Sequence, residues 1–238
     1  MKSLQEIVDK GKRIVFFGGA GVSTESGIPD FRGAGGIFME EQEIPPEAVL
    51  SESFFYLHPE AFFAFYRKKL LHPEARPNAA HRKLWELERT GKLLGIVTQN
   101  IDGLHRMAGN RLVFEIHGSV HRNFCMDCGR EYPMRFVLES AGIPRCECGG
   151  VVKPDVVLYG EALDPPTMRG AMRVISQADV LIVAGTSLSV SPAAEFLENF
   201  SGRELVVINR EELPLEKKAT LPLRGSVAEV MGRIHVEI

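Results

Sequence analysis

Four cysteines are the residues of this sequence whose spacing indicates a chemical role most directly. They form one CxxC pair and one CxC pair, and the rest of the 238-residue chain contains no cysteine. The four are Cys125, Cys128, Cys146 and Cys148. Thiols paired at this spacing are typical of a zinc ribbon, and four thiolates leave no open coordination position, so we expect one structural zinc ion. Free cysteines are the alternative, and His117 and His121 could substitute as ligands.

A glycine-rich segment, GGAG at residues 18–21, directly follows an apolar run at residues 13–17. Glycines after a first strand let the backbone approach a pyrophosphate, and the start of a following helix favours the anion. Thr24 stands where the usual dinucleotide fingerprint has its third glycine, and no acidic residue for the ribose follows about 20 residues on. A hydride-transferring dehydrogenase is therefore not favoured, and an ordinary glycine-rich turn is the alternative.

The chain continues through small residues to Asp30, Phe31 and Arg32. Phe31 could cover a flat ring, and Arg32 could pair with a phosphate. The alternative is a structural loop in which Asp30 caps a turn and Phe31 is buried. Residues 30–69 begin rich in glycine and proline and then become aromatic with helical spacing. This stretch therefore predicts a mobile loop at the site, followed by a helical insert.

Polar side chains also follow a second apolar run, at residues 93–98. Gln99, Asn100 and Asp102 carry amide and carboxylate groups that suit a ribose or a carboxamide. Open α/β sheets bind their ligands at the carboxyl ends of the strands, which is where these side chains would lie. A helix start that is capped by Asn100 or Asp102 is the alternative.

Three further apolar runs end in polar residues. His117 follows one of them, and histidine is the natural general base near neutral pH. Gly185, Thr186 and Ser187 follow another, and Asn209 and Arg210 follow the third. These last residues could bind phosphate, ribose or adenine through short side chains and backbone N–H groups. A structural histidine and ordinary loops are the alternatives.

The apolar runs and the patterns between them indicate the elements that position these residues. The runs are short and nearly continuous, which is typical of parallel strands covered on both faces. Helical patterns alternate with them, so the predicted fold class is α/β, with a Rossmann-like, doubly wound parallel sheet. The predicted strands are residues 13–17, 93–98, 113–116, 180–184 and 205–208. The predicted helices are residues 77–90, 166–176 and 192–199.

Composition limits the class of protein. The chain is 45% hydrophobic and has a net charge of −3, as expected of a globular protein. A dedicated nucleic-acid binder would normally be basic. No apolar run approaches the ~18 residues of a membrane span, and the first residues lack the apolar stretch of a signal peptide. We therefore expect a cytoplasmic protein that binds neither nucleic acid nor a membrane.

Taken in order along the chain, the motifs resemble those of the sirtuin family, the NAD-dependent protein lysine deacylases. The resemblance covers nearly the whole chain, and the ordered set is highly specific although no single motif is. Besides the four-cysteine segment, the motifs are GAGVSTESGIPDFRG (residues 19–33), TQNIDGLH (98–105), HG (117–118), VKPDVVLYGE (152–161), GTSLSV (185–190) and IN (208–209).

The resemblance implies a Rossmann-like NAD domain and a smaller domain made of a zinc ribbon and a helical insert. An acyl-lysine peptide and NAD would meet in the cleft between them. The implied Rossmann-like domain comprises residues 1–33, 91–120 and 152–238. Residues 34–90 would form a mobile cofactor loop and the helical insert, and residues 121–151 the zinc ribbon.

The resemblance also implies site residues. His117 would be the general base, with Asn100 as a second catalytic residue. The implied NAD-binding residues are Gly19, Ala20, Gly21, Thr24, Asp30, Phe31, Arg32, Gln99, Asn100, Ile101, Asp102, Gly185, Thr186, Ser187, Asn209, Val227 and Ala228. The implied peptide-binding residues are Tyr66, Lys69, Val156, Val157, Leu158 and Tyr159. The last four would pair with the substrate backbone as an added strand.

The implied activity is NAD-dependent lysine deacylation, most simply deacetylation. NAD is consumed, and the products are free lysine, nicotinamide and O-acyl-ADP-ribose. Tyr66 and Lys69 stand where family members that prefer succinyl or malonyl lysine carry Tyr-x-x-Arg. Lys69 could attract an acidic acyl group as a point charge, and a solvated helix face is the alternative. The sequence also leaves open mono-ADP-ribosyl transfer from the same NAD site and a non-enzymatic zinc-ribbon interaction module.

Overall fold

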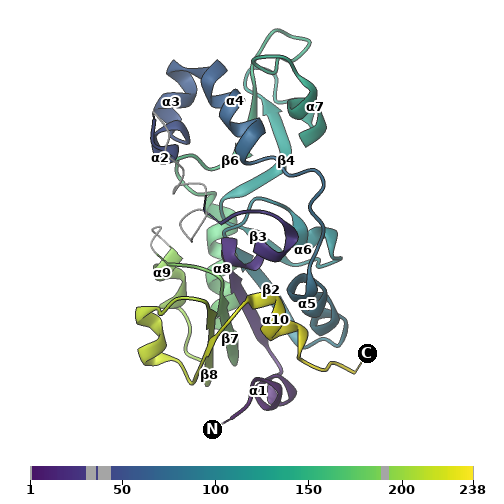
Figure 1. Ribbon diagram of the computed structural model, residues 1–238, viewed down its shortest axis with the longest axis vertical. Helices are drawn as coiled ribbons and strands as arrows, with labels where there is room; N and C mark the ends of the chain where they lie inside the picture. Colours follow the sequence, from purple (N-terminus) through teal and green to yellow (C-terminus); the bar gives the residue numbers. More distant parts are fainter. Residues whose placement is uncertain (1, 31–35, 37–43, 189–192, 238) are drawn as a thin grey trace.

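The computed structural model describes residues 2–30, 36, 44–188 and 193–237, which form two sheets with helices around them (Figure 1). In these residues the larger sheet has six parallel strands in the order β3-β2-β1-β7-β8-β9. Its strands are β1 (Ile14–Gly18), β2 (Leu93–Thr98), β3 (Val113–Glu115), β7 (Val180–Ala184), β8 (Glu204–Asn209) and β9 (Leu221–Arg224). The predicted fold class is confirmed.

Both faces of the parallel sheet are covered, which explains why its strands are apolar throughout. In β1 every residue is buried, with Phe16 in the apolar cluster of one face and Phe17 in that of the other. The helices on the Phe16 face are α1 (Leu4–Lys10), α5 (Ala79–Arg89) and α10 (Val227–Gly232). Those on the Phe17 face are α8 (Pro165–Ser176) and α9 (Ala193–Leu197).

Strand β1 lies near the centre of the parallel sheet, between β2 and β7. The chain leaves β1 to build β2 and β3 on one side, and later builds β7, β8 and β9 on the other. The connections from β1 and β7 therefore run in opposite directions. Sheets of this kind bind ligands in the crevice that opens at the carboxyl ends of such strands.

The smaller sheet is antiparallel, in the order β5-β4-β6, and lies in the upper part of Figure 1. Its core is aromatic, because Phe55, Phe62, Phe63 and Tyr66 from the neighbouring helices are fully buried against it. Its strands are β4 (Gly118–Cys125), β5 (Glu131–Tyr132) and β6 (Val152–Val156). Its helices are α2 (Pro46–Val49), α3 (Glu52–Leu57), α4 (Pro59–Lys69) and α7 (Met134–Glu139).

The segment after β1 differs from the sequence-based expectation. The sequence predicts a helix there, but the chain forms two 3₁₀ turns, η1 (Ala20–Val22) and η2 (Thr24–Ser26). Gly27 ends the second turn in the left-handed conformation, with φ of +83°, and Pro29 follows shortly after it. No long helix therefore begins in this segment.

The carboxyl-terminal elements β9 and α10 are not among the predicted ones. Pro222 interrupts the pattern of β9, yet this is an edge strand, where proline is tolerated. Ser226 caps the start of helix α10, because its side chain accepts a hydrogen bond from the backbone N–H of Glu229. The remaining short helices are α6 (Leu104–Met107) and η4 (Pro214–Lys218). None of the helices in the described ranges has the length and apolar character needed to cross a bilayer.

Candidate active site

A cavity of about 720 Å³ opens at the carboxyl ends of the parallel strands. Its walls come from the loops after β1, β2, β7 and β8 on one side and from the loop after β6 on the other. The predicted NAD-binding residues that line it are Ala20, Gly21, Thr24, Asp30, Gln99, Asn100, Ile101, Gly185, Thr186, Ser187, Asn209 and Val227. The remaining predicted residues that line it are His117, Val156, Val157, Leu158 and Tyr159.

Tyr66 does not lie at this cavity, contrary to its predicted role in acyl recognition. Its side chain is 0% exposed and stacks on Phe62, with the ring centroids 5.7 Å apart. Burial raises the pKa of the Tyr66 hydroxyl above its usual range. The face of α4 that carries Tyr66 therefore serves the core of the smaller part, as aromatic residues at helical spacing commonly do.

Four more predicted residues are placed away from the large cavity. Asp102 and Lys69 line a second, smaller cavity of about 50 Å³. Gly19 and Ala228 are buried and line neither of the two cavities. Their neighbours Ala20 and Val227 take the places at the large cavity.

Sequence reasoning assigned no site role to a further group of cavity residues, from the helical insert, from the chain after β6 and from the loops after β8 and β9. They are Leu50, Leu70, Gly160, Glu161, Ala162, Leu163, Met168, Glu211, Gly225 and Ser226. Arg210, which was predicted together with Asn209, lines the cavity as well. Glu161 carries a usable signal, because it ends the motif at residues 152–161. Leu50 and Leu70 carry none, because they reach the cavity only when the helical insert packs beside the parallel sheet.

The glycines after β1 and β7 pack directly against each other. The Gly21 N–H donates to the Gly185 carbonyl at 2.8 Å, and a Cβ on Gly21 would lie 2.8 Å from Gly185 Cα. A Cβ on Gly185 would lie 2.6 Å from the backbone nitrogen of Val22. The contact between the two loops therefore requires these glycines, and it leaves bare backbone at the cavity, which suits a pyrophosphate. Phe31 and Arg32, predicted further along the same segment, lie outside the described residues.

Ser23 ties Asn100 and Asp102 to the turns after β1. Its hydroxyl donates to Asp102 Oδ2 at 2.6 Å and accepts from Asn100 Nδ2 at 3.1 Å. Asp102 Oδ1 accepts from the N–H of Leu104 at 2.8 Å, so this carboxylate also caps the start of α6. Burial raises the pKa of the Asp102 carboxyl. These bonds fix the orientation of the Asn100 carboxamide at the edge of the large cavity.

His117 has the geometry of a general base. It lies between β3 and β4, half-buried at the cavity, with Nδ1 3.0 Å from the Gln99 carbonyl oxygen. A carbonyl can only accept, so Nδ1 carries the proton and the lone pair lies on Nε2. Burial lowers the pKa of His117, which keeps the imidazole neutral at pH 7. Gln99 is itself held by the Thr186 hydroxyl, which donates to Gln99 Oε1 at 2.8 Å.

The segment after β6 offers the cavity its side chains, while its backbone donors are already used. The N–H groups of Val157, Leu158 and Tyr159 are donated within the chain at 3.0, 2.9 and 2.9 Å. Their acceptors are, in that order, the carbonyl of His117, Glu161 Oε2 and the carbonyl of Leu50. A substrate strand would have to pair with backbone carbonyls here or displace those bonds, and the backbone pairing along residues 156–159 stays a prediction.

The four cysteines meet at one end of the smaller sheet in an arrangement that fits zinc. Their Sγ atoms lie within 4.8 Å of one another, and tetrahedral zinc with Zn–S bonds of about 2.3 Å places sulfurs roughly 3.8 Å apart. All four are free thiols. Gly129 and Gly149, with φ of +70° and +94°, turn the chain after each pair. The Tyr132 hydroxyl donates to Cys146 Sγ at 3.0 Å and lowers the pKa of that thiol to about 6.

The chain also matches proteins of known family. Residues 19–192 match the model of the Sir2 family. The chain belongs to the Sir2 family. Among its Sir2-family relatives, the NAD-dependent protein deacetylase of Clostridium perfringens (strain 13 / Type A) is 54% identical over 238 residues, which cover 98% of each chain. The NAD-dependent protein deacetylase of Cutibacterium acnes is 50% identical and covers 98% of this chain and 97% of its own.

Solved Sir2 structures share the fold along the whole chain. A complex described as Sir2 with p53 peptide and NAD⁺ is 37% identical, has a TM-score of 0.85 and covers 98% of this chain and 97% of its own. A Sir2 enzyme bound to a propionylated peptide is 36% identical, with a TM-score of 0.84 and coverage of 96% and 94%. The resemblance predicted from the motifs is therefore confirmed.

The large cavity of this Sir2-family chain suits a dinucleotide on its own geometry. The touching glycines leave bare backbone at the loops after β1 and β7. Gln99, Thr186 and Asn209 add short polar side chains along the same strand ends. The residues present therefore fit NAD, and the four thiols fit one zinc ion.

Proposed function

We propose that this protein is an NAD-dependent protein lysine deacylase, most simply a deacetylase. One observation carries the proposal: His117 presents an unprotonated Nε2 at a cavity whose opposite wall is formed by the glycine loops of a nucleotide-binding sheet. A base in that place can serve a reaction between a nucleotide ribose and a second substrate entering from the smaller part. The expected products are free lysine, nicotinamide and O-acyl-ADP-ribose.

The NAD-binding residues divide into two groups in this proposal. Gly21 and Gly185 would leave room for the diphosphate, and Ser187 and Asn209 would hold the adenosine half. Gln99, Asn100 and Ile101 would surround the nicotinamide ribose, because their loop reaches the cavity beside His117. NAD supplies the chemistry by breaking its bond to nicotinamide, which makes its ribose carbon electrophilic toward the acyl oxygen.

The protein's own contribution is to orient groups and to move one proton. His117 Nε2 would accept a proton from a ribose hydroxyl, while the Gln99 carbonyl holds the Nδ1 proton and stabilises the imidazolium that forms. The Asn100 carboxamide, fixed by Ser23, would orient the bound ribose or nicotinamide. Leu50 and Leu70, with Ile101, would help to exclude water from the reacting centre.

The second substrate in the proposal is an acyl-lysine side chain of a peptide or protein. Val156 and Leu158 supply an apolar wall that suits the methylene stem of lysine, and half-exposed Tyr159 stands at its rim. We place the reaction in the cytoplasm, because four clustered free thiols suit a reducing compartment. The mildly negative chain offers no net basic charge of the kind that nucleic acid requires, so proteins rather than nucleic acids are the expected partners.

A panel of acyl-lysine peptides tests the proposal. The protein is incubated with NAD and acetyl, propionyl, butyryl, malonyl or succinyl peptide, and the products are identified by mass spectrometry. Deacylated peptide and O-acyl-ADP-ribose in equal amounts, dependent on NAD, are the expected result. ADP-ribosylated protein without deacylated peptide would favour mono-ADP-ribosyl transfer instead, and binding of peptide without any NAD-dependent product would leave only an interaction module.

A further inference from the structure

Strand β4 contains a bulge that begins three residues after His117, the proposed base. Ser119 pairs with Asp155 on β6, but the next pair is Asn123 with Pro154, so residues 120–122 are extra on β4. A bulge bends its strand and redirects the side chains it carries. In this chain the redirected residues face the loop after β2 and the end of β3, which belong to the parallel sheet.

The first two bulge residues bind the loop that carries Asn100 and Asp102. The Val120 N–H donates to the Ile101 carbonyl at 2.9 Å. His121 Nε2 lies 3.0 Å from the Asp102 carbonyl oxygen, which makes Nε2 the donor. His121 also packs on Gly103, where a Cβ would lie 2.5 Å from the imidazole ring. The smaller sheet therefore holds the cofactor-facing loop directly.

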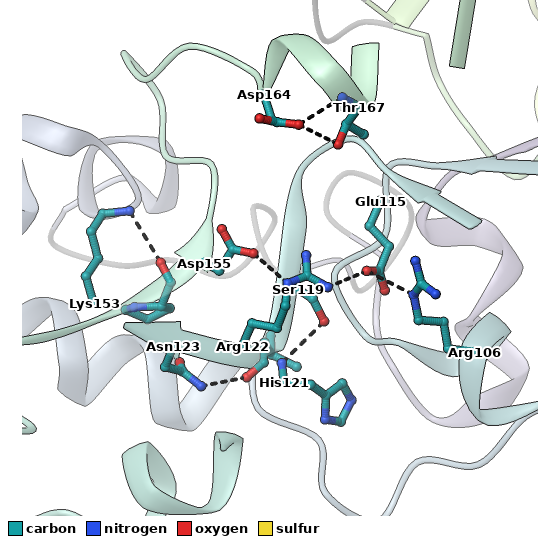
Figure 2. Close-up of polar contacts among 12 residues, drawn as sticks. Arg106, Glu115, Ser119, His121, Arg122, Asn123, Lys153, Asp155, Asp164 and Thr167 are labelled. Atoms are coloured by element: carbon teal, nitrogen blue, oxygen red, sulfur yellow. Dashed lines mark hydrogen bonds and ion pairs between the residues drawn. The ribbon is translucent and has the colours of Figure 1, made fainter. Parts of the chain in front are cut away.

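The third bulge residue, Arg122, joins the two sheets by ion pairs, which Figure 2 shows. Its Nη1 lies 2.7 Å from Glu115 Oε2 at the end of β3, and its Nε lies 2.7 Å from Asp155 Oδ2 on β6. The Glu115 side chain is only 4% exposed, so removing an arginine partner would leave a buried carboxylate with fewer hydrogen-bond donors. Arg106 approaches the same Glu115 oxygen at 3.3 Å, but from within the parallel part.

The positions of the two carboxylates give this bridge a functional consequence. Glu115 stands two residues before His117, and Asp155 stands one residue before Val156, where the substrate wall begins. Behind the bulge, buried Asn123 donates from Nδ2 to the carbonyls of Val120 and Tyr132. One guanidinium thus spans the gap between the strand end that carries the base and the strand that carries the acyl-lysine wall.

We propose that Arg122 is a positioning residue for deacylation, which sets the placement of His117 relative to the wall at residues 156–159. This inference rests on the proposed function. A guanidinium can bind both carboxylates at once through its fork, whereas the ammonium of lysine is a point charge. Small displacements of reacting groups cost large factors in rate, so the effect belongs to the chemical step and not to nucleotide binding.

Three variants test this role against a general structural one. Arg122→Gln is expected to lower kcat for acetyl-peptide deacylation about tenfold or more, with the Kd for ADP-ribose within about twofold of wild type. The kcat of Arg122→Lys should lie between those of wild type and Arg122→Gln, because lysine restores the positive charge without the planar fork of the guanidinium. Arg106→Gln is the matched control, since it removes the second arginine of Glu115 without touching the smaller sheet, and its kcat should stay within about threefold.

Each possible result decides for or against the positioning role. If Arg122→Gln lowers kcat no more than Arg106→Gln does, or if ADP-ribose binding is lost together with activity, Arg122 has no positioning role. A rise in peptide KM with unchanged kcat also overturns the proposal, because it would assign Arg122 to peptide binding. If the wild-type protein shows no NAD-dependent deacylation, the proposed function fails, and that failure is seen before any variant is made.

Discussion

The parallel sheet and the three-stranded sheet differ in what surrounds their strands. The parallel sheet has an apolar cluster on each face, with strands such as β1 and β7 buried along their whole length. The smaller sheet has one aromatic cluster, its strand β5 has two residues, and two of its four clustered thiols are exposed. The first sheet can thus be stabilised by burial alone. The second has one cluster only, so we expect the zinc ion that its thiols fit to add to its stability.

This difference divides the candidate site into two parts. The proposed nucleotide wall rests on the parallel sheet, through the loops after β1, β2, β7 and β8. The proposed acyl-lysine wall begins at the end of β6 and rests on the sheet that carries the thiols. His117 lies on the connection between them, because it follows β3 and precedes β4. Perturbing one sheet should therefore impair one function more than the other, although the contacts of Val120 and His121 with the loop after β2 couple the two.

The largest expected effect comes from His117→Ala, which removes the base and leaves both sheets in place. We expect kcat for deacylation to fall at least about 100-fold. ADP-ribose binding by calorimetry and the thermal unfolding midpoint should stay close to wild type, because the ring fills no core position. A variant that deacylates at the wild-type rate would remove His117 from the mechanism.

Loss of zinc is expected to impair the smaller sheet more than the parallel sheet. Chelation, or Cys128→Ser, should lower deacylation about tenfold or more, as the smaller sheet loosens. ADP-ribose binding should fall less than deacylation does, because the thiols lie on the smaller sheet, which reaches the nucleotide side through the contacts of Val120 and His121. Met126→Ser, at an exposed position of the same turn, is the matched control. A fully active protein without zinc would show that the two sheets do not differ in this way.

Acid should weaken the parallel part through two buried histidines, His81 on α5 and His105 on α6. Their ring centroids are 4.7 Å apart. Burial lowers the pKa of His81 to about 4, and it lowers that of His105 as well. The unfolded chain therefore takes up protons first, so stability is complete above the ordinary pKa near 6.5 and is lost as the pH falls toward about 4.

For His81 this loss amounts to about 3 kcal/mol across that range. Urea unfolding at pH 7 and pH 5 measures the upper part of this loss, about 2 kcal/mol. His81→Leu is expected to flatten the dependence, and the variant His58→Gln at an exposed position is the control. Comparing slopes cancels the opposite contribution of Asp102, whose carboxyl pKa is raised by burial. An unchanged slope in His81→Leu would contradict the assignment.

The smallest expected effect concerns acyl preference at α4. Lys69 lines the smaller cavity and not the large one, and Tyr66 is buried in the core. Lys69→Ala should therefore change the ratio of succinyl to acetyl turnover by less than about twofold, as should Lys68→Ala beside it. If Lys69→Ala selectively loses succinyl turnover and Lys68→Ala does not, Lys69 does take part in acyl recognition.

Much of the fold follows from local pattern, and the exceptions have physical reasons. Each predicted strand matches an observed one to within one residue, because buried parallel strands are continuous apolar runs. The helix predicted after β1 is absent, because the glycine contact between Gly21 and Gly185 and the left-handed Gly27 favour short turns. Strand β9 was not predicted, because its pairing with β8 makes it a strand and its own residue pattern does not indicate one.

The candidate site also has features that the sequence predicts and features that it does not. Polar residues at strand ends could be predicted, because parallel strands bring their carboxyl ends to one edge. Tyr66 could not be placed, because an aromatic residue at helical spacing fits a core and a cavity equally well until the helix is packed. The hydrogen-bonded state of residues 157–159 also depends on partners distant in the sequence, such as Leu50.

The sequence by itself determined the family, the strands and the chemical types at their ends, since these depend on residue identity and short spacing. It also determined the four thiols, whose number and spacing are local. Only the tertiary structure decided that Nε2 of His117 is the basic atom, that Tyr66 is buried, and that Arg122 spans both sheets. Each of these depends on a contact between segments that meet only after folding, as with the Gln99 carbonyl and His117.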